Sequence, residues 1–317
     1  MSNFQPELLK VAVLAGGISS EREISRNSGA AVARALGEAG FNHVDLMDPA
    51  EPDTFKKLLE GNYDVCFPAL HGEGGEDGCI QGMLEWLKIP YAGSNVTASA
   101  CAADKDISKL LYARAGIPLA PGVMLEAGQD YDIDEILSVV GQNSFVKPAV
   151  NGSSYGVTPV NDPAKLPEAI EEAFKYDDKV LVEKCIKGVE ITVGVIGNEN
   201  PEALPIIEIV PGDGAEFYDL EVKYDDPEKH HVCPARLSEK DYARAQELAC
   251  AAHCALGCSG MSRSDFIVSE DEGPVILETN TIPGMTETSL FPDAGRHAGM
   301  TFPQECARLI ELALERA

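Results

Sequence analysis

Residues 261–285 read MSRSDFIVSEDEGPVILETNTIPGM, and this stretch decides the fold of the C-terminal part of the chain. Two apolar runs flank the turn-prone SEDEG, a pattern that is typical of a β-hairpin. We predict that the turn is centred between Asp271 and Glu272. The two strands then pair along their length and present alternating side chains on two faces.

The predicted register places two carboxylates opposite each other. Asp265 pairs with Glu278 and Arg263 pairs with Asn280, all on one face of the hairpin. Opposed carboxylates repel one another, but a divalent cation between them would bind well. Oxygen ligands of this kind suit a magnesium ion that also contacts substrate phosphates. Arg263 would stabilise negative charge on a phosphoryl or acyl oxygen. The alternative is a solvated polar face.

A second segment, SFVKPAVNGSSYGVTPV at residues 144–160, is typical of a phosphate-binding loop. Lys147 ends an apolar strand, and a Gly-Ser loop with Ser153 and Ser154 follows. Backbone amides and hydroxyls in such a loop can hold phosphate oxygens while a lysine neutralises them. The GKS or GKT of a Walker A loop is absent, and an ordinary turn between strands is the alternative.

A third segment, KVLVEKCIKGVEITV at residues 179–193, joins two predicted strands. Connections between two small sheets can bind a purine through backbone groups. Glu183 and Glu190 could then bind its exocyclic amine or the ribose hydroxyls. Taken alone, both residues are equally consistent with a solvated surface.

The first hundred residues alternate short apolar runs with helical patterns, such as VAVLAG, SEREISRNSGAAVARALGEAG and HVDLMD. This alternation indicates a parallel sheet flanked by helices. Ser20 and Glu23 have the spacing of a capping box at the start of the first long helix. We therefore expect an α/β (α+β) fold that begins with a Rossmann-like parallel-sheet domain.

Changes of pattern near residues 100 and 190 divide the chain into three predicted domains, 1–100, 101–190 and 191–317. Within the third, residues 211–234 form an irregular stretch longer than an ordinary loop. Two Tyr, a Phe and a Lys lie within eight residues of this stretch. This favours a lid over a disordered insertion.

The charge balance excludes several classes of partner. Lys and Arg number 25 and Asp and Glu number 52, so the formal net charge is −27. A surface this acidic repels nucleic acid and anionic lipid. No secretory leader is visible, and no stretch approaches about 18 consecutive apolar residues. We expect a cytoplasmic protein with no nucleic-acid or membrane partner.

The nine cysteines lack paired CxxC spacing and fit a reducing compartment. Cys250, Cys254 and Cys258 recur every four residues beside His253, as on a metal-binding helix face. The surrounding ELACAAHCALGCSG is small and apolar. A buried helix is therefore the favoured interpretation.

Together, and in this order, the segments resemble the D-alanine:D-alanine ligase family of ATP-grasp enzymes. The resemblance runs from AVLAGGISSEREISRNSG through FPALHGEGGEDGCIQGMLE, FVKPAVNGSSYGV, VEKCIKGVEITV and FYDLEVKY to RSDF and LETNTIPGMTETSLFP. It implies a three-domain ATP-grasp fold, in which 1–100 binds substrate, 101–190 is the small central domain and 191–317 is the catalytic domain with its lid.

The resemblance also implies the reaction. The γ-phosphate of ATP passes to the carboxylate of one D-alanine, the amine of a second D-alanine attacks the acyl phosphate, and the tetrahedral intermediate collapses to dipeptide and phosphate. The family's role is to supply peptidoglycan precursors. The implied cofactors are ATP and two Mg²⁺ or Mn²⁺ ions, and the implied assembly is a homodimer.

Matched motifs assign roles to individual residues. The implied substrate-binding and catalytic residues are Glu21, His71, Ser153, Lys223, Tyr224, Arg263, Gly284 and Ser289. The implied nucleotide-binding residues are Lys105, Lys147, Ser153, Ser154, Glu183, Lys184, Ile186 and Glu190. The implied metal ligands are Asp265, Glu278 and Asn280.

Among these roles, Glu21 would hold the ammonium of the first D-alanine, and Ser289 with Lys223 the carboxylate of the second. Arg263 and the amide of Gly284 would form the oxyanion site.

Two alternatives stay open. A D-alanine:D-lactate or D-alanine:D-serine ligase has a changed lid, whereas Lys223 and Tyr224 match the pattern expected for D-alanine. A catalytically inactive ATP-binding regulator would lack Arg263 or a metal ligand, and all are present. One departure from the family, Ser264 in RSDF, is predicted to lie on the face opposite Arg263.

Overall fold

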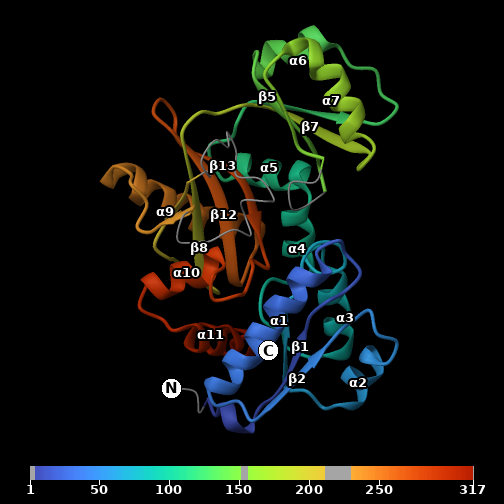
Figure 1. The fold of residues 1–317 in the computed structure, drawn as a ribbon, viewed down its shortest axis with the longest axis vertical. Coiled ribbons are helices and arrows are strands. Elements are labelled where there is room, and N and C mark those ends of the chain that lie inside the picture. Colours follow the sequence, from blue (N-terminus) through green and yellow to red (C-terminus); the bar gives the residue numbers. More distant parts are fainter. Residues whose placement is uncertain (1–3, 151–155, 211–229, 317) are drawn as a thin grey trace.

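The computed structural model describes residues 4–150, 156–210 and 230–316. Three sheets follow one another along the molecule, with the N-terminal sheet at one end and a small sheet at the other (Figure 1). The largest sheet lies between them. The expected mixture of a parallel sheet with antiparallel sheets is confirmed.

The N-terminal sheet is parallel, with strand order β2-β1-β3. Its strands are β1 (Lys10–Leu14), β2 (His43–Met47) and β3 (Val65–Pro68), and its helices are α1 (Arg22–Glu38), α2 (Thr54–Glu60) and α3 (Cys79–Leu87), after a short 3-10 turn at Pro6–Leu8. The predicted capping box is wrong, because α1 starts at Arg22 with Glu21 as N-cap and no side-chain cap. Instead the Ser19 hydroxyl accepts a bond from the Glu21 amide.

The small sheet is antiparallel, with strand order β4-β7-β5-β6. Its elements are β4 (Gly122–Glu126), α6 (Ile133–Val140), β5 (Ser144–Pro148), β6 (Thr158–Val160), a 3-10 turn (Pro163–Lys165), α7 (Leu166–Ala173) and β7 (Lys179–Lys184). Apolar side chains of α6 and α7 pack with those of the strands into one buried cluster. Helices α4 (Val96–Ala103) and α5 (Lys105–Arg114) precede this sheet.

The largest sheet has the order β11-β10-β8-β12-β13, and β9 also pairs with β8. Its strands are β8 (Val189–Gly197), β9 (Glu202–Ala203), β10 (Ile207–Ile209), β11 (His231–Val232), β12 (Gly260–Ser269) and β13 (Gly273–Asn280). The helices of this part are α9 (Glu239–Leu256), α10 (Leu290–His297) and α11 (Phe302–Glu315). Every pairing in this sheet is antiparallel.

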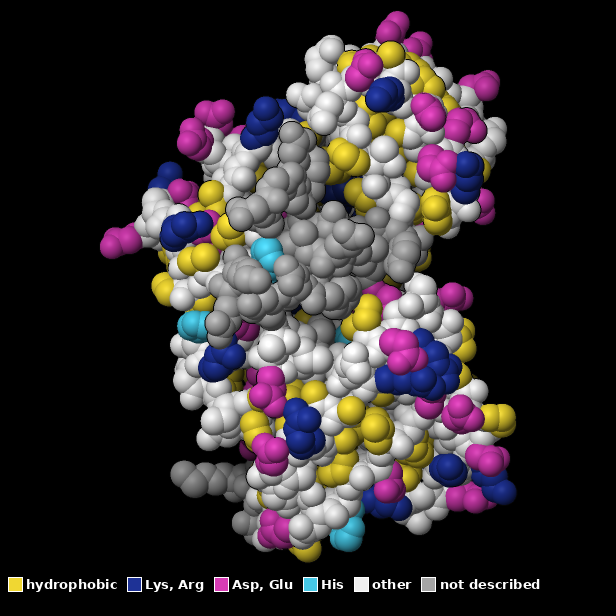
Figure 2. Space-filling model, viewed as in Figure 1, with side chains coloured by type: hydrophobic (Ala, Val, Ile, Leu, Met, Phe, Trp, Pro, Cys, Tyr) yellow, Lys and Arg dark blue, Asp and Glu magenta, His cyan; other side chains and the backbone are white. Residues whose placement is uncertain are grey.

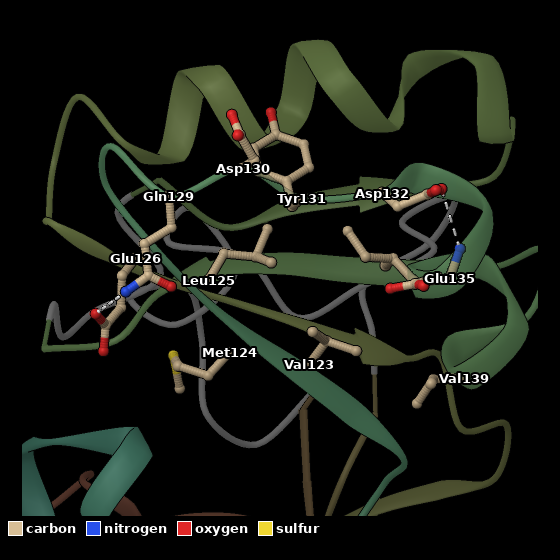
Figure 3. A pocket seen from close by; sticks show the side chains of 11 residues that line it. Val123, Met124, Leu125, Glu126, Gln129, Asp130, Tyr131, Asp132, Glu135 and Val139 are labelled. Carbon is tan, nitrogen blue, oxygen red and sulfur yellow. Dashed lines mark hydrogen bonds between the residues drawn. The ribbon is translucent and has the colours of Figure 1, made fainter.

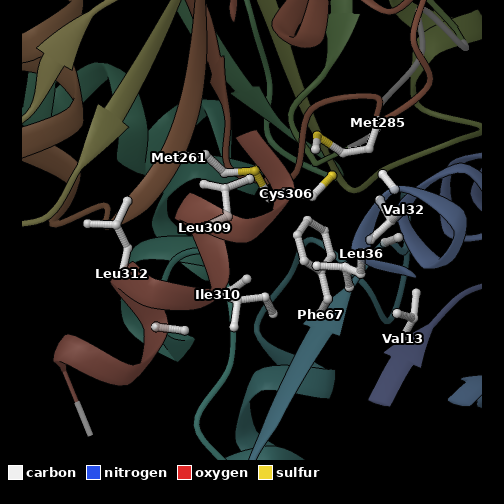
Figure 4. Close-up of a cluster of buried hydrophobic side chains, with 14 of the residues drawn as sticks. Val13, Val32, Leu36, Phe67, Met261, Met285, Cys306, Leu309, Ile310 and Leu312 are labelled. Carbon is white, nitrogen blue, oxygen red and sulfur yellow. The ribbon is translucent and has the colours of Figure 1, made fainter. Parts of the chain in front are cut away.

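The C-terminal helix α11 packs against the N-terminal sheet. Leu309 and Ile310 of α11 share a buried cluster with Val13, Leu36 and Phe67 (Figure 4). A second cluster joins α5 to α9 and the largest sheet. The N-terminal sheet and the C-terminal helix thus share one hydrophobic core, while the small sheet has a cluster of its own. The three domain ranges stay predictions.

Charged side chains of both signs stand on the face of the molecule seen in Figure 2. On the face in Figure 2, acidic side chains are spread over its upper, left and lower parts. Among the described residues, no helix is both long and apolar enough to cross a membrane.

Candidate active site

The predicted pairing at the centre of the hairpin is confirmed. Asp265 lies opposite Glu278 and Arg263 lies opposite Asn280. All four are partly exposed, whereas Ser264 lies buried on the other face with Thr279, 2.7 Å between their hydroxyl oxygens. One face of β12 and β13 therefore carries the charged groups.

The turn itself differs from the prediction. Ser269 pairs with Gly273, so the turn is centred on Asp271 rather than between Asp271 and Glu272. The register shifts farther along, between Asp265 and Phe266, because Leu277 is an extra residue in β13. This β-bulge restores the predicted pairs at the charged face.

Asp265 is held by two side chains of this sheet. Arg263 donates to it through Nε at 3.1 Å and Nη2 at 2.9 Å, and Thr192 donates through its hydroxyl at 2.5 Å. Burial acts to lower the pKa of Arg263, but Asp265 outweighs it and raises that pKa above its usual value. The carboxylate is thereby oriented before any ligand binds.

Glu278 faces a lysine from α5. The Lys105 ammonium lies 3.4 Å from its carboxylate, and the Glu278 side chain is 46% exposed. Asp104 caps α5 with its side chain, and the Lys105 amide donates to the carbonyl of Ala149 just after β5. This cap and bond place Lys105 between the hairpin and the strand that carries Lys147.

Glu183 is enclosed by two lysines. Its side chain is 2% exposed, and its oxygens lie 2.5 Å from the Lys147 ammonium and 2.7 Å from that of Lys109. Burial acts to raise the pKa of Glu183, but the two cations lower it to about 2. Lys109 was missed from the sequence, although it lies one helical turn after Lys105 and so shares its face of α5.

The charge of Glu190 acts at the same point as that of Glu183. Burial acts to lower the pKa of Lys147, but Glu183, Glu278 and Glu190 raise it, so their charges all act on one ammonium. Glu190 lies in β8 opposite Ile267. Lys184 ends β7 and Ile186 follows in the connection to β8, both partly exposed.

The N-terminal part contributes a buried histidine. His71 Nε2 lies 3.0 Å from the Ser28 hydroxyl, which accepts a bond from the amide of Met285 at 3.3 Å. His71 Nδ1 lies 3.5 Å from Glu76, whose charge also acts on Arg263. His71 is therefore linked through Ser28 to the loop that follows β13.

Glu21 lies beside the loop that contains His71, because a Cβ on Gly72 would be 3.1 Å from its carboxylate. Glu21 is 8% exposed and stands at the N-terminus of α1. The loop after β13 brings Gly284 next to Ser289, the N-cap of α10. A Cβ on Gly284 would lie 3.0 Å from the Ser289 hydroxyl, so a side chain here would crowd that hydroxyl.

Four predicted residues lie outside the described part of the chain. They are Ser153, Ser154, Lys223 and Tyr224. Residues 230–234 of the predicted lid are described and include β11.

A pocket lies away from these residues, on the small sheet. Side chains of β4, α6 and the segment between them line it, with Val123, Met124 and Leu125 along β4 (Figure 3). Acidic side chains such as Glu126 and Glu135 stand at its border. None of the predicted site residues lines this pocket.

The cysteine-rich segment does not present a single helical face. Helix α9 ends at Leu256 because Gly257 adopts a left-handed conformation, so Cys258 lies beyond it. His253 is buried and bonded to the Ser262 hydroxyl at 2.8 Å, whereas Cys254 is exposed. Burial lowers the pKa of His253 to about 4. In the described ranges, no three His, Cys, Asp or Glu side chains form a metal-binding group.

Two family models match the chain. The model described as D-ala D-ala ligase C-terminus matches residues 111–311, and the model described as D-ala D-ala ligase N-terminus matches residues 46–94. The chain belongs to the D-alanine–D-alanine ligase family.

Relatives in this family resemble the chain over its whole length. A D-alanine–D-alanine ligase of Syntrophobacter fumaroxidans is 48% identical over 309 residues, covering 98% of this chain and 99% of the relative. One of Desulforamulus reducens is 44% identical, covering 97% and 99%.

Solved structures agree with the fold. The D-alanine–D-alanine ligase of Bacillus anthracis matches with a TM-score of 0.85 at 34% identity, covering 97% of this chain and 98% of that one. A structure of the Bacillus anthracis ligase complexed with ATP matches with a TM-score of 0.81 at 31% identity and the same coverage. The expected ATP-grasp family and fold are confirmed.

Proposed function

We propose that this chain joins two D-alanine molecules at the expense of ATP, with ADP and phosphate as the other products. The observation that carries the proposal is the register of β12 and β13, which puts Arg263, Asp265, Glu278 and Asn280 on one face. Lys105 lies against this face and Lys147 lies within the electrostatic reach of Glu278. Cations for phosphate and oxygen ligands for a metal thus stand together.

The first step forms an acyl phosphate. A carboxylate oxygen of the first D-alanine attacks the γ-phosphorus of ATP, and ADP leaves with the electrons of the broken bond. Lys105 and Lys147 would hold the phosphates. Lys109 is a further candidate for binding the nucleotide, because its ammonium lies 2.7 Å from the Glu183 carboxylate. Glu183, Lys184, Ile186 and Glu190 would hold the adenosine.

Asp265, Glu278 and Asn280 offer two carboxylates and an amide, the hard oxygen donors that Mg²⁺ or Mn²⁺ takes. Their opposition across the hairpin fits a divalent cation, and we propose that two ions bind there with ATP. When bound, the ions would offset the negative charge that builds up during phosphoryl transfer.

The second step forms the peptide bond. The amine of the second D-alanine attacks the acyl carbon, loses a proton, and the tetrahedral intermediate expels phosphate. Arg263 and the amide of Gly284 would stabilise the oxyanion. Ser289 would bind the carboxylate of the second substrate at the N-terminus of α10, where a negative charge is favoured. Glu21 and His71 would bind the first D-alanine.

The residues outside the described part complete the proposal. Ser153 and Ser154 would contact phosphate, and Lys223 would bind the carboxylate of the second D-alanine together with Ser289. Tyr224 would close over the acyl phosphate, which water would otherwise hydrolyse. We also propose a cytoplasmic homodimer that supplies peptidoglycan precursors.

The test is incubation of the purified protein with ATP and Mg²⁺ in four parallel reactions. Two contain a single amino acid, D-alanine or L-alanine, and two contain D-alanine mixed with either D-lactate or D-serine. Phosphate release and product mass are measured together. We expect D-alanyl-D-alanine and no turnover with L-alanine. A mixed ester or mixed dipeptide as main product would favour the D-lactate or D-serine alternative, and ATP binding without turnover would favour the inactive regulator.

A further inference from the structure

Helix α10 carries a buried carboxylate one turn after Ser289. The Asp293 amide donates to the carbonyl of Ser289 at 2.9 Å, and Asp293 is 5% exposed. An ionised carboxylate in such a position is costly unless other groups compensate its charge. Its neighbours therefore decide how the first turn of α10 is held.

Three basic side chains lie around the Asp293 carboxylate, and His297 Nδ1 also lies 2.9 Å from the backbone carbonyl of Asp293. His231 Nδ1 lies 3.2 Å from Oδ2, Arg296 donates to Oδ1, and His297 Nδ1 lies 3.3 Å from Oδ1. Burial acts to raise the pKa of Asp293, but the hydrogen bond from His231 and the charge of Arg296 outweigh it and lower that pKa. Asp293 is thus an anion at neutral pH.

Of these three groups, only His231 comes from another element. Arg296 and His297 belong to α10 itself, whereas His231 lies in β11, opposite Ile209 of β10. The His231 side chain is 8% exposed, so water screens the bond weakly. The pair therefore ties α10 to the sheet that carries the hairpin face.

Much of the remaining packing of α10 is apolar, although Gly295 lies against the Glu305 carboxylate of α11. Phe291 and Ala294 are buried in the cluster shared with α11 and the N-terminal sheet. Apolar packing fixes which face of the helix is buried, but it is not directional and leaves small rotations of the helix less restrained. A charge-assisted hydrogen bond is directional, so the bond from His231 sets the orientation of the turn that bears Ser289.

We propose that Asp293 and His231 are positioning residues for the site of the second D-alanine. Their bond orients the first turn of α10, so that the Ser289 hydroxyl and the first amides of the helix face the substrate carboxylate together. The inference rests on the proposed function, because it takes Ser289 as the group that binds this carboxylate.

The test compares Asp293→Asn and His231→Leu with the wild type in initial-rate measurements at saturating ATP. We expect the KM for the second D-alanine to rise about tenfold, as for the loss of one charge-assisted hydrogen bond. The KM for ATP and kcat should stay within about twofold. His231→Asn, which keeps an N–H donor near the position of Nδ1, should recover most of the loss.

A matched control lies one strand away. Glu208 in β10 is 7% exposed and bound by the Arg236 guanidinium, so Glu208→Gln also removes a buried, paired charge. The Glu208–Arg236 pair does not involve a residue of α10. Glu208→Gln should lower Tm to a similar extent while leaving the KM for the second D-alanine unchanged.

Hydrogen exchange of residues 290–297 separates this inference from the proposed function. The backbone amides of residues 290–297 should exchange faster in Asp293→Asn than in the wild type, and at the wild-type rate in Glu208→Gln. If the wild type makes no dipeptide, the proposed function is overturned. The hydrogen exchange of residues 290–297 would then still decide whether the bond between His231 and Asp293 orients α10. An unchanged KM in His231→Leu, an equal rise in Glu208→Gln, or unchanged exchange in Asp293→Asn would overturn the inference.

Discussion

Glu183 and Glu278 both face lysines, but their surroundings differ. Glu183 is 2% exposed and lies between Lys109 and Lys147, whereas Glu278 is 46% exposed, faces Lys105 at 3.4 Å and stands opposite another carboxylate. A buried anion between two lysines is costly to remove, because its loss leaves both cations unpaired. A half-exposed anion beside a second one costs little to retain and is open to a ligand.

The largest expected effect is on the open carboxylate. Glu278→Ala should lower the rate of dipeptide formation on the order of a thousandfold, because loss of a metal ligand removes several kcal/mol of transition-state stabilisation. The free energy of unfolding of the ligand-free protein should change by less than about 1 kcal/mol, since exposed pairs contribute little. Steady-state kinetics and urea denaturation measure the two quantities. A large loss of stability would make Glu278 a structural residue and erase the difference from Glu183.

The enclosed carboxylate should behave in the opposite way. Glu183→Ala leaves two lysines buried without their anion and should lower the free energy of unfolding by about 3–5 kcal/mol. Urea denaturation at neutral pH provides the measurement, with Glu278→Ala as the matched control.

The pH dependence of that loss has a definite sign. Because the pKa of Glu183 is lowered to about 2 in the folded protein, its stabilisation is present above the usual value of 4.5 and disappears as the pH falls toward 2. The stability difference between wild type and Glu183→Ala should therefore shrink in this range. A difference that stays constant with pH would show that the ion pairs are not its source.

A third carboxylate is buried without a lysine. Glu305 in α11 is 1% exposed, and neither of its oxygens has a hydrogen-bond partner among the described residues. Burial raises its pKa to about 8, so between the usual 4.5 and about 8 the folded state holds a proton that the unfolded state has lost. Stability should fall as pH rises through this window.

Glu305→Leu should raise the free energy of unfolding by roughly 1–3 kcal/mol at pH 8, since it removes a buried polar group without a partner. The gain should be smaller near pH 5. Denaturation curves at the two values test this, and a loss of stability at both would mean that the carboxyl group has a partner in solution.

The smallest effect is expected on the reverse face of the same hairpin. Ser264→Ala removes the buried bond to Thr279 and should cost about 1 kcal/mol of stability. Catalysis should stay within about twofold, because the hydroxyl points away from Arg263. A loss of activity comparable to that of Glu278→Ala would show that the chemistry is not confined to one face.

The sequence predicted the charged face because hairpin pairing depends on local alternation and a turn signal. It did not predict the bulge at Leu277, which depends on how β13 packs in the sheet. The prediction of the pairs Asp265–Glu278 and Arg263–Asn280 was correct although the predicted turn centre was wrong, because the bulge shifts the register back by one residue.

Contacts between distant elements were beyond the sequence pattern. Lys109 binds Glu183 only because α5 packs beside β7 and β5, and His231 meets Asp293 only because β11 lies beside α10. The packing of α11 on the N-terminal sheet is likewise a tertiary contact. The roles of Glu21 and Ser289 came from resemblance and that of Arg263 also from its place on the hairpin face, and all three stay predictions.

In the proposed reaction, the D-alanine carboxylate is phosphorylated before the peptide bond forms. D-alanine labelled with ¹⁸O in both carboxylate oxygens, incubated with ATP, Mg²⁺ and the protein, tests it directly by mass analysis of the released phosphate. We expect one ¹⁸O in the phosphate for each dipeptide made, because the carboxylate oxygen that attacks the γ-phosphorus leaves with the phosphate. Dipeptide accompanied by unlabelled phosphate would contradict the proposed reaction.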